Sequence, residues 1–421
     1  MTSRRGSRRR TVAREVRGAL KRAFLTVFFT QLAIVFALVG IDNWRKRIRP
    51  RRVTFPRTAP ARMPVGGSEA TTFTYGEDLF ADMLESIRGA RSRILFETYI
   101  WKGDELGREF KQALIDAAER GVEVYVIYDG FANLVVHRSF KRFPASIHVL
   151  EYPLFRPGLL LLNIRKSGRD HRKILVVDGE TAYVGGYNIG STYATDWRDT
   201  HIKVNGPSAW DFENAFVDFW NSQRVNGLPL LADEGARTWE PRIRTHRNMP
   251  GLLVFPIRGM YLEAIDRARD HIYITQAYFI PDREILQGLL SAARRGVDVR
   301  VLVPERSNHV VADWLSRGFY STLLRGGITI WLYKDAMVHA KTATIDGKWT
   351  TIGTANIDRL SLTGNYEINV EVFDEDLAAQ MEKVYANDST NARRLTAGEW
   401  DRRALAAKFS EFVLAPLRPL L

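Results

Sequence analysis

The sequence lacks cysteine altogether, and outside its first 52 residues it has no excess of charge of either sign. Without cysteine the 421-residue chain has no disulfides, thiolate zinc sites, iron–sulfur clusters or cysteine nucleophiles. Its hydrophobic content of 45% and charged content of 26% exclude a disordered tail protein and a collagen-like fibre. The length is enough for two or three domains with a substantial core.

The positive charge of the chain is confined to its N-terminal part. The formal charge is +13, and residues 1–52 hold fifteen Lys or Arg against two acidic residues. The remaining 369 residues carry 46 basic and 46 acidic side chains. This balance argues against an extended nucleic-acid surface, although a local basic patch stays open.

Residues 23–41 form a run of nineteen residues without a charge, AFLTVFFTQLAIVFALVGI. As a helix this run is about 28 Å long, close to the hydrocarbon thickness of a bilayer. Basic clusters flank it on both sides, which is unusual for a buried core helix, and no clear signal-peptide cleavage site follows Ala37. We predict an uncleaved transmembrane helix. Nine basic residues precede it and six follow it, which slightly favours a cytoplasmic N-terminus and an exported body. Both flanks are basic enough to bind anionic headgroups, so the side of the membrane stays open.

The rest of the chain contains two copies of one unit, at 92–130 and 271–304. Each copy reads as an apolar strand, a loop, an amphipathic helix ending in Ala-Ala-x-Arg-Gly, and a second strand. Gly121 and Gly296 stand where helix C-caps are expected. We predict an α/β fold of two pseudo-symmetric repeats, each a mainly β-sheet core with parallel strands, flanked by helices.

The predicted organisation follows from these segments. It consists of a basic cytoplasmic-type tail (1–22), the transmembrane helix (23–41), a basic juxtamembrane linker (42–70), a first repeat (71–227), an inter-repeat linker (228–250) and a second repeat (251–421).

A second block also occurs twice, HRKILVVDGETAYVGGYN at 171–188 and HAKTATIDGKWTTIGTAN at 339–356. Counted from the His, both copies have Lys at +2, Asp at +7, Gly at +14, Asn at +17 and a carboxylate at +28. We expect one site between the two repeats, built from His171, Lys173, Asn188 and Asp199 of the first copy and His339, Lys341, Asn356 and Glu367 of the second.

Strand geometry separates the roles of the acidic residues. Side chains alternate between the faces of a strand, so the His and Lys of each copy share a face that the Asp at +7 does not. Asp178 and Asp346 are each followed by Gly, which predicts hairpin turns and a structural role. Asp199 and Glu367 are the better candidates for orienting the His rings, with exposed edge-strand acids as the alternative.

Two His, two Lys and two Asn at one point suit a phosphodiester. Lys173 and Lys341 supply positive charge, and Asn188 and Asn356 supply amide donors for the transition state. One neutral imidazole attacks phosphorus while the other, as imidazolium, protonates the leaving oxygen. Zinc-binding spacings such as HExxH are absent, and we predict no metal and no cofactor.

The duplicated pattern HxKx₄Dx₆G[GST]xN resembles the phospholipase D superfamily. The segments 169–179, 197–207, 338–370 and 414–421 are similar to bacterial cardiolipin synthases, and the resemblance covers about residues 72–421. It implies a catalytic set of His171, Lys173, Asp178, His339, Lys341 and Asp346, which includes the two Asp that the turn chemistry assigns to structure.

The resemblance also implies an activity. It is a phosphatidyltransferase of the bacterial inner membrane that joins two phosphatidylglycerol molecules into cardiolipin and glycerol, through a phosphatidyl-histidine and without metal. His171 is then favoured as the nucleophile and His339 as the acid/base. Its partners are phospholipids and the membrane, not nucleic acid. A phospholipase D hydrolase releasing phosphatidic acid, a nuclease of the same superfamily and a non-catalytic scaffold are the alternatives.

Two features depart from the family pattern. Many such synthases have two N-terminal spans where this chain shows one, and Gly186 and Thr354 stand where the family often has Ser. The apolar run 152–163, just before the first motif, is interpreted either as a lipid-facing lip or as a segment packed in the core.

Overall fold

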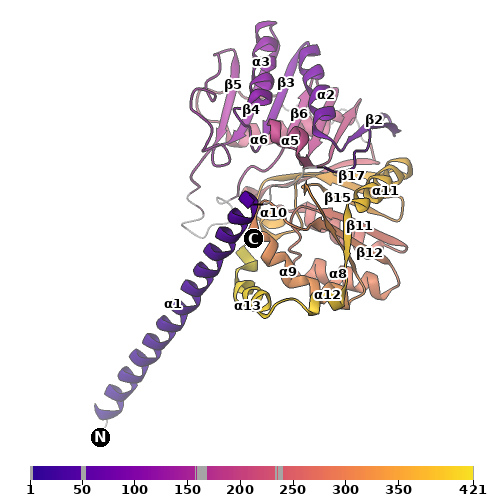
Figure 1. Ribbon diagram of the computed structural model, residues 1–421. Coiled ribbons are helices and arrows are strands. Elements are labelled where there is room, and N and C mark those ends of the chain that lie inside the picture. The colour runs from indigo at the N-terminus through magenta and orange to yellow at the C-terminus, as the bar shows by residue number, and fades with distance from the viewer. Residues whose placement is uncertain are drawn as a thin grey trace.

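The computed structural model describes residues 3–48, 54–156, 158, 168–232, 235 and 240–420 (Figure 1). Residues 157 and 159–163 of the apolar run before the first motif lie outside this part of the chain. Two sheets and their helices form one body, and the long helix α1 (Ser3–Ile48) projects from it (Figure 1).

Each repeat is built on an eight-stranded sheet. The strand order of the first is β1 (Ala61–Val65), β2 (Ser68–Phe73), β9 (His201–Asn205), β7 (Thr181–Gly185), β6 (Ile174–Val177), β3 (Arg93–Thr98), β4 (Glu123–Asp129) and β5 (Ile147–Tyr152). The order of the second is β10 (Ile243–Asn248), β17 (Glu367–Phe373), β16 (Trp349–Gly353), β15 (Lys341–Ile345), β11 (His271–Gln276), β12 (Asp298–Pro304), β13 (Thr329–Tyr333) and β18 (Ala392–Leu395).

The two sheets match over six strands. In the first sheet β3, β4 and β5 are parallel, while β6, β7 and β9 run antiparallel to their neighbours. The second sheet repeats this pattern in β11, β12 and β13 and in β15, β16 and β17. The prediction of parallel strands is therefore confirmed for half of each unit, and the motif hairpins supply the antiparallel half.

Helices connect and cover the sheets. They are α2 (Gly76–Gly89), α3 (Glu105–Glu119), α5 (Ser191–Thr195) and α6 (Ala209–Gln223) in the first repeat, and α7 (Pro256–Arg267), α8 (Arg283–Arg294), α9 (Val310–Arg325), α10 (Arg359–Thr363), α11 (Glu375–Thr390), α12 (Ala397–Asp401) and α13 (Leu405–Leu414) in the second. The predicted C-cap glycines are confirmed, because Gly121 and Gly296 follow the ends of α3 and α8 with φ of 90° and 93°.

One hydrophobic core is shared by both repeats. It includes Phe216 and Trp220 of α6 together with Ile368 of β17 and Leu377 and Met381 of α11, all buried. Strand β7 of the first sheet contacts β16 and β17 of the second. Separate cores lie under α2 and α3 and under α7 and α8. The sheets are thus joined through apolar packing and do not form two independent domains.

Ordered elements occupy parts of the segments that we predicted as linkers. Helix α1 continues to Ile48, and β1 and β2 begin within 42–70. Strand β10 lies within 228–250 and pairs with β17 over six residues. Its sequence, IRTHRN, has little apolar character, so the pairing of its backbone rather than its side chains places it in the sheet.

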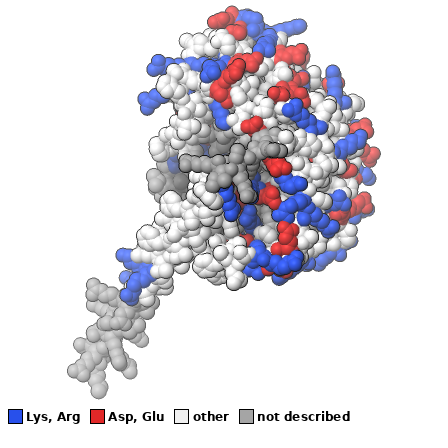
Figure 2. Space-filling model, in the orientation of Figure 1, with Lys and Arg blue, Asp and Glu red and all other residues white. Residues whose placement is uncertain are grey.

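Among the described residues, one helical stretch, Arg17–Arg45 of α1, is long and apolar enough to cross a membrane. Figure 2 shows that α1 is largely uncharged between a basic cluster toward its free end and its junction with the body. Acidic and basic side chains are interspersed over the body in the same view. Ile34, Val35 and Leu38 of α1 pack against a cluster that includes Leu315 of α9.

Candidate active site

The two motifs lie next to each other where backbone hydrogen bonds join the two repeats. Strand β8 (Trp197–Arg198) of the first repeat pairs in parallel with β14 (Met337–Val338) of the second. The amide of His171 donates to the carbonyl oxygen of Tyr366 at 3.0 Å, and the amide of His339 donates to that of Arg198 at 2.7 Å. Each acceptor lies 27 residues after the His of the other motif, so the pseudo-symmetry brings the two His segments together.

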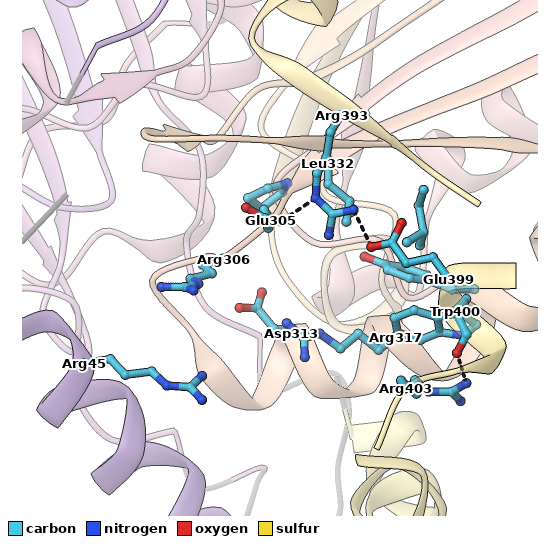
Figure 3. Close-up of a pocket in the computed structure, with 13 residues that line it drawn as sticks. Arg45, Glu305, Arg306, Asp313, Arg317, Leu332, Arg393, Glu399, Trp400 and Arg403 are labelled. Atoms are coloured by element: carbon cyan, nitrogen blue, oxygen red, sulfur yellow. Dashed lines mark hydrogen bonds and ion pairs between the residues drawn. The ribbon is translucent and has the colours of Figure 1, made fainter. Parts of the chain in front are cut away.

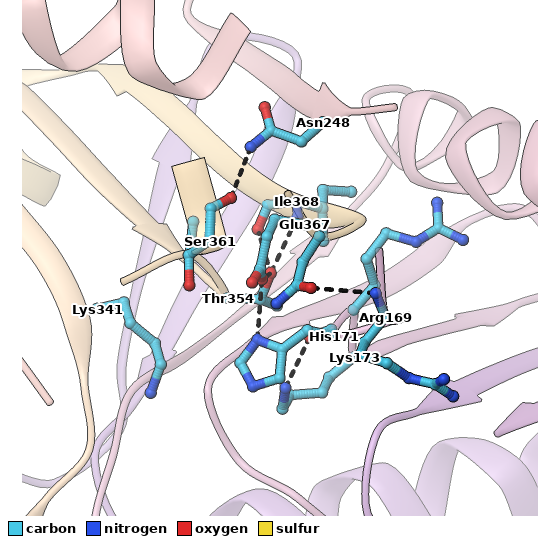
Figure 4. A network of polar contacts seen from close by, with 12 residues as sticks. Arg169, His171, Lys173, Asn248, Lys341, Thr354, Ser361, Glu367 and Ile368 are labelled. Carbon is cyan, nitrogen blue, oxygen red and sulfur yellow. Dashed lines mark hydrogen bonds and ion pairs between the residues drawn. The ribbon is translucent and has the colours of Figure 1, made fainter. Parts of the chain in front are cut away.

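Each imidazole faces a carboxylate that belongs to the other motif. Nδ1 of His171 lies 2.9 Å from Oε2 of Glu367, and Nδ1 of His339 lies 2.6 Å from Oδ2 of Asp199 (Figure 4 shows the first pair). We predicted that these two acids face the rings, and the structure places both there. It adds that the partners are exchanged between the repeats, so that neither repeat contains a complete His–carboxylate pair.

The two motif lysines are buried beside the histidines. Nζ of Lys173 donates to the carbonyl oxygen of His171 at 2.7 Å. Nζ of Lys341 donates to the carbonyl oxygen of His339 and lies 2.8 Å from its Nδ1. Burial lowers the pKa of Lys173 to about 7 and that of Lys341 to about 8. The site therefore holds positive charge that is only weakly stabilised until an anion arrives.

The surroundings of both imidazoles favour the neutral form of the ring. Burial and the nearby lysines lower the pKa of His339 to about 3 and move the pKa of His171 well below its ordinary value. Tyr99 lies against the His171 ring with 4.6 Å between ring centroids, and Trp197 against the His339 ring with 4.9 Å. Aromatic walls and desolvation thus favour the uncharged rings.

The two carboxylates differ in charge. Burial raises the pKa of Glu367 to about 8 despite the positive charge of Lys173. Burial acts in the same direction on Asp199, but the charge of Lys341 and contacts with His339 hold its pKa below the ordinary value. At neutral pH His339 therefore faces an ionised acid, while His171 faces one that is largely protonated.

Asp178 and Asp346 sit in the hairpin turns and contact backbone. The carboxylate of Asp178 accepts from the amides of residues 91–93, and that of Asp346 from the amides of residues 269–271, at 2.8–3.3 Å. Both residues have a φ of 54°, as a tight β-turn requires. The hairpin prediction is confirmed, and the contacts found for these carboxylates link β3 and β11 to the motif hairpins.

The two motif asparagines are buried next to the motif strands. Oδ1 of Asn188 accepts from the amide of Ile100 at 3.1 Å, so the NH₂ group forms the opposite, donor end of this side chain. Oδ1 of Asn356 is buried without a hydrogen-bond partner among the described residues. An uncompensated polar group of this kind is costly, and it is typical of a site that binds a ligand.

The departures from the family pattern at Gly186 and Thr354 have a structural reason. The hydroxyl of Thr354 donates to Oε2 of Glu367 at 2.5 Å (Figure 4). A Cβ at Gly186 would lie 2.1 Å from Oδ1 of Asp199, so a side chain there would displace that carboxylate. The two positions are equivalent in the motif. Thr354 binds the carboxylate of Glu367, whereas Gly186 leaves space for the carboxylate of Asp199.

Sequence reasoning missed a pair of supporting residues. His201 and Asn369 both lie 30 residues after their motif His, and each accepts the amide at +16, from Tyr187 and Ala355 respectively, at 3.2 Å. Extending the comparison of the copies by two residues beyond +28 would have aligned these positions. The two residue types differ, which hides the equivalence from a search for identical residues.

Within the described ranges, no group of three or more His, Asp or Glu side chains is arranged to hold a metal ion. The side chains gathered at the site include imidazole, ammonium and amide groups, which are able to donate hydrogen bonds to phosphate oxygens.

Comparison with known proteins identifies the family to which this chain belongs. The model described as "Cardiolipin synthase, PLD-like domain" matches residues 83–220 and 261–389. The chain belongs to the cardiolipin synthase family of phospholipase D-like proteins. These two ranges contain both copies of the motif, so the family assignment rests on the same residues as the site.

Curated members of the cardiolipin synthase family are similar over most of the chain. Cardiolipin synthase 2 of Staphylococcus epidermidis is 32% identical, with 84% of this chain and 75% of the relative covered. The major cardiolipin synthase of Bacillus subtilis is 31% identical, with 83% and 74% covered. A solved phosphatidylserine synthase of Haemophilus influenzae shares the fold, with a TM-score of 0.63, 15% identity and 85% and 94% of the two chains covered.

Proposed function

We propose that this protein is a phosphatidyltransferase that joins two phosphatidylglycerol molecules into cardiolipin and glycerol. The observation that carries the proposal is the pair of His–carboxylate contacts exchanged between the two motifs, with a buried lysine beside each. Family membership supports the same activity, because the curated relatives are named cardiolipin synthases.

In the first half-reaction one imidazole displaces glycerol from phosphatidylglycerol. Nδ1 of each ring faces its carboxylate, so Nε2 is the nitrogen left to approach phosphorus. Attack by Nε2 of His171 forms a P–N bond as the bond from phosphorus to the glycerol oxygen breaks. The other imidazole delivers the proton that this oxygen needs. Lys173 and Lys341 neutralise the phosphoryl oxygens meanwhile.

The difference between the two carboxylates supports His171 as the nucleophile. A nucleophilic imidazole has to stay neutral, and a largely protonated Glu367 gives little stabilisation to an imidazolium at His171. Ionised Asp199 stabilises positive charge on His339 once the phosphodiester has entered and offset the two lysines. His339 is then the acid in the first step and the base in the second.

In the second half-reaction the headgroup hydroxyl of another phosphatidylglycerol attacks the phosphatidyl-histidine. His339 removes the hydroxyl proton, the new P–O bond forms, and the P–N bond to His171 breaks to release cardiolipin. Water in place of this hydroxyl would give phosphatidic acid. The orientation of the acceptor therefore decides between a transferase and a hydrolase.

The proposed anchor is helix α1, as a single span in the bacterial inner membrane. Its apolar stretch, the basic residues on both sides and the lipid substrate support this location. The proposal leaves the side on which the body lies to be measured.

The test uses purified full-length protein in phosphatidylglycerol vesicles, with lipid products identified by mass spectrometry. His171→Ala and His339→Ala variants run in parallel, and their thermal unfolding is compared with that of the parent protein. We expect cardiolipin and glycerol from the parent and neither product from the folded variants.

Two results would contradict the transferase. Phosphatidic acid without cardiolipin would make the protein a hydrolase. No turnover of the lipid, combined with cleavage of single-stranded DNA that depends on His171, would favour a nuclease.

A further inference from the structure

Helix α13 presents an apolar face that nothing in the described part of the chain covers. Leu405, Phe409 and Phe412 are spaced i, i+4 and i+7, and so lie on one side of the helix. Their exposed fractions are 81%, 57% and 78%. Exposed aromatic and aliphatic side chains in such a row are typical of a surface that binds a partner or a membrane.

The charged residues of α13 point away from this face. Nζ of Lys408 donates to the carbonyl oxygen of Asp401 at 2.7 Å. Glu411 is buried and forms an ion pair with Arg403 at 2.6 Å. The helix is therefore amphipathic, with its polar groups turned toward the body and its apolar face toward the outside.

The position of α13 beside α1 identifies what covers this face. Nε2 of Gln31 in α1 donates to the carbonyl oxygen of Val413 in α13 at 3.0 Å. Gln31 lies ten residues before the end of the apolar run at Ile41, a distance of about 15 Å along a helix. If α1 spans a bilayer, the end of α13 lies well below the headgroup level and not in water.

The apolar contacts of α1 also place α13 beside the apolar stretch of that helix. Ile34, Val35 and Leu38 pack against a buried cluster that includes Leu414 of α13. Leu417 of the 3₁₀ segment η3 (Ala415–Leu420) packs against the same cluster. Segment η3 in turn contacts α10, which follows Asn356 of the second motif. Contacts between packed elements therefore lead from the span through α13 and η3 to α10, which lies next to the second motif in the sequence.

Basic side chains mark the expected headgroup level. A cavity of about 270 Å³ beside the C-terminal end of α1 is lined by five arginines and three acidic residues (Figure 3). The arginines are Arg45, Arg306, Arg317, Arg393 and Arg403. Arg45 lies four residues beyond Ile41, where a spanning helix leaves the hydrocarbon. Arg393 pairs with Glu305 and Glu399, and Arg403 pairs with Glu411 of α13, so the five arginines exceed these acids and Asp313 by one. A small surplus of positive charge at this level suits the phosphates of anionic lipids.

We propose that the apolar face of α13 is embedded in the leaflet that α1 leaves at Ile41, so that the site is held against the bilayer and not on a flexible tether. The inference rests on the proposed anchoring by α1. The enzyme would then take its lipids from this leaflet along the surface formed by α13, η3 and α10.

The absence of cysteine makes the depth of α13 measurable with single-cysteine variants. Phe409→Cys and Phe412→Cys in the full-length protein are labelled with a fluorophore and reconstituted in vesicles of phosphatidylcholine and phosphatidylglycerol. Some vesicles also contain lipids with nitroxide-bearing acyl chains. Phe28→Cys in α1 reports on the span, and Glu119→Cys at the end of α3 is the control on the body. Cardiolipin formation is measured on the same samples.

Interfacial helices bury their apolar face about 5–10 Å into the bilayer, so we expect the nitroxide lipids to reduce emission at 409 and 412 about twofold or more. Emission at 119 should not change. Quenching at 28 with none at 409 and 412 would overturn the α13 inference and leave the anchor in place. In that case, disulfide-linked dimers formed by unlabelled Phe412→Cys protein after addition of a mild oxidant would identify a second copy as the cover. Quenching at 409 and 412 without cardiolipin formation would support the membrane contact of α13 and contradict the proposed reaction.

Discussion

At the scale of single residues, the two carboxylates that face the histidines differ in pKa although they occupy equivalent positions in the motifs. Burial raises the pKa of Glu367 to about 8 although the hydrogen bond from Thr354 opposes this, while Lys341 helps to keep Asp199 ionised. In the proposed mechanism this difference makes His339 the acid and His171 the nucleophile, although the two motifs are symmetric. The roles of the acids can be separated by substitution, because Asn preserves the shape of Asp and removes its charge.

Asp199→Asn should lower the rate of cardiolipin formation about 100-fold, because an uncharged partner no longer stabilises an imidazolium at His339. The measurement is the initial rate in phosphatidylglycerol vesicles, normalised to folded protein. A rate within a factor of about three of the parent would show that Asp199 does not act through His339.

Asp178→Asn is the matched variant at a turn. Asn tolerates the positive φ at this position but accepts fewer hydrogen bonds from residues 91–93, so stability should fall by about 1–3 kcal/mol. The rate per folded molecule should stay near that of the parent. Backbone donors lower the pKa of Asp178, so its contribution is present at neutral pH and is lost as pH falls. The difference in melting temperature should therefore shrink below about pH 4.

The pH dependence of turnover should report on Lys173. Its pKa of about 7 means that the ammonium form is lost as pH rises through neutrality, and with it the attraction for the phosphodiester. We expect kcat/KM to fall on the alkaline side, mainly through KM. Arg stays charged over this range, so Lys173→Arg should shift that limb to higher pH. If the fall in kcat/KM at alkaline pH is unchanged in a folded Lys173→Arg variant, the deprotonation of a residue other than Lys173 causes it.

At the scale of elements, β8 and α11 are joined by an ion pair across the repeats. Arg198 forms two contacts with Asp388, at 2.7 and 2.8 Å, and both side chains are almost fully buried. The carbonyl oxygen of Arg198 also accepts the amide of His339. The pair therefore fixes the strand that positions one histidine.

Asp388→Ala should cost about 3–5 kcal/mol, because it leaves a buried guanidinium without its partner. Denaturant unfolding in detergent measures the loss. Glu109→Ala, which breaks an exposed pair with Arg88, is the control and should cost less than about 1 kcal/mol. Equal losses in the two variants would show that the buried pair has no special role in holding β8 against α11.

Local patterns carried most of the fold prediction, and tertiary contacts account for what it missed. The hairpins at Asp178 and Asp346 and the C-caps at Gly121 and Gly296 depend on neighbouring residues alone, and all four are where the sequence predicts them. The approach of Asp199 and Glu367 to the histidines was expected from their common offset. Their exchange between repeats was not, because an offset counted within one motif contains no information about the other.

At the scale of the whole molecule, the repeats depend on one another for their core. Residues of α6 and α11 pack in a single cluster with strands of both sheets. A protein limited to residues 54–227 would expose that cluster to water, so we expect it to aggregate or to bind a hydrophobic dye strongly. Size-exclusion chromatography and dye fluorescence test this. A monomeric fragment with sharp thermal unfolding would show that the first repeat is an independent domain.

The exchange of carboxylates has a consequence for how such a chain can change over generations. After a gene duplication, one copy can usually accumulate mutations while the other retains the original function. Here Asp199 contacts His339 and Glu367 contacts His171, so in the proposed mechanism a substitution of either acid impairs the histidine of the other half. The two halves are therefore expected to be under joint selection, and at the equivalent positions 186 and 354 they differ in a way that suits the carboxylate beside each one.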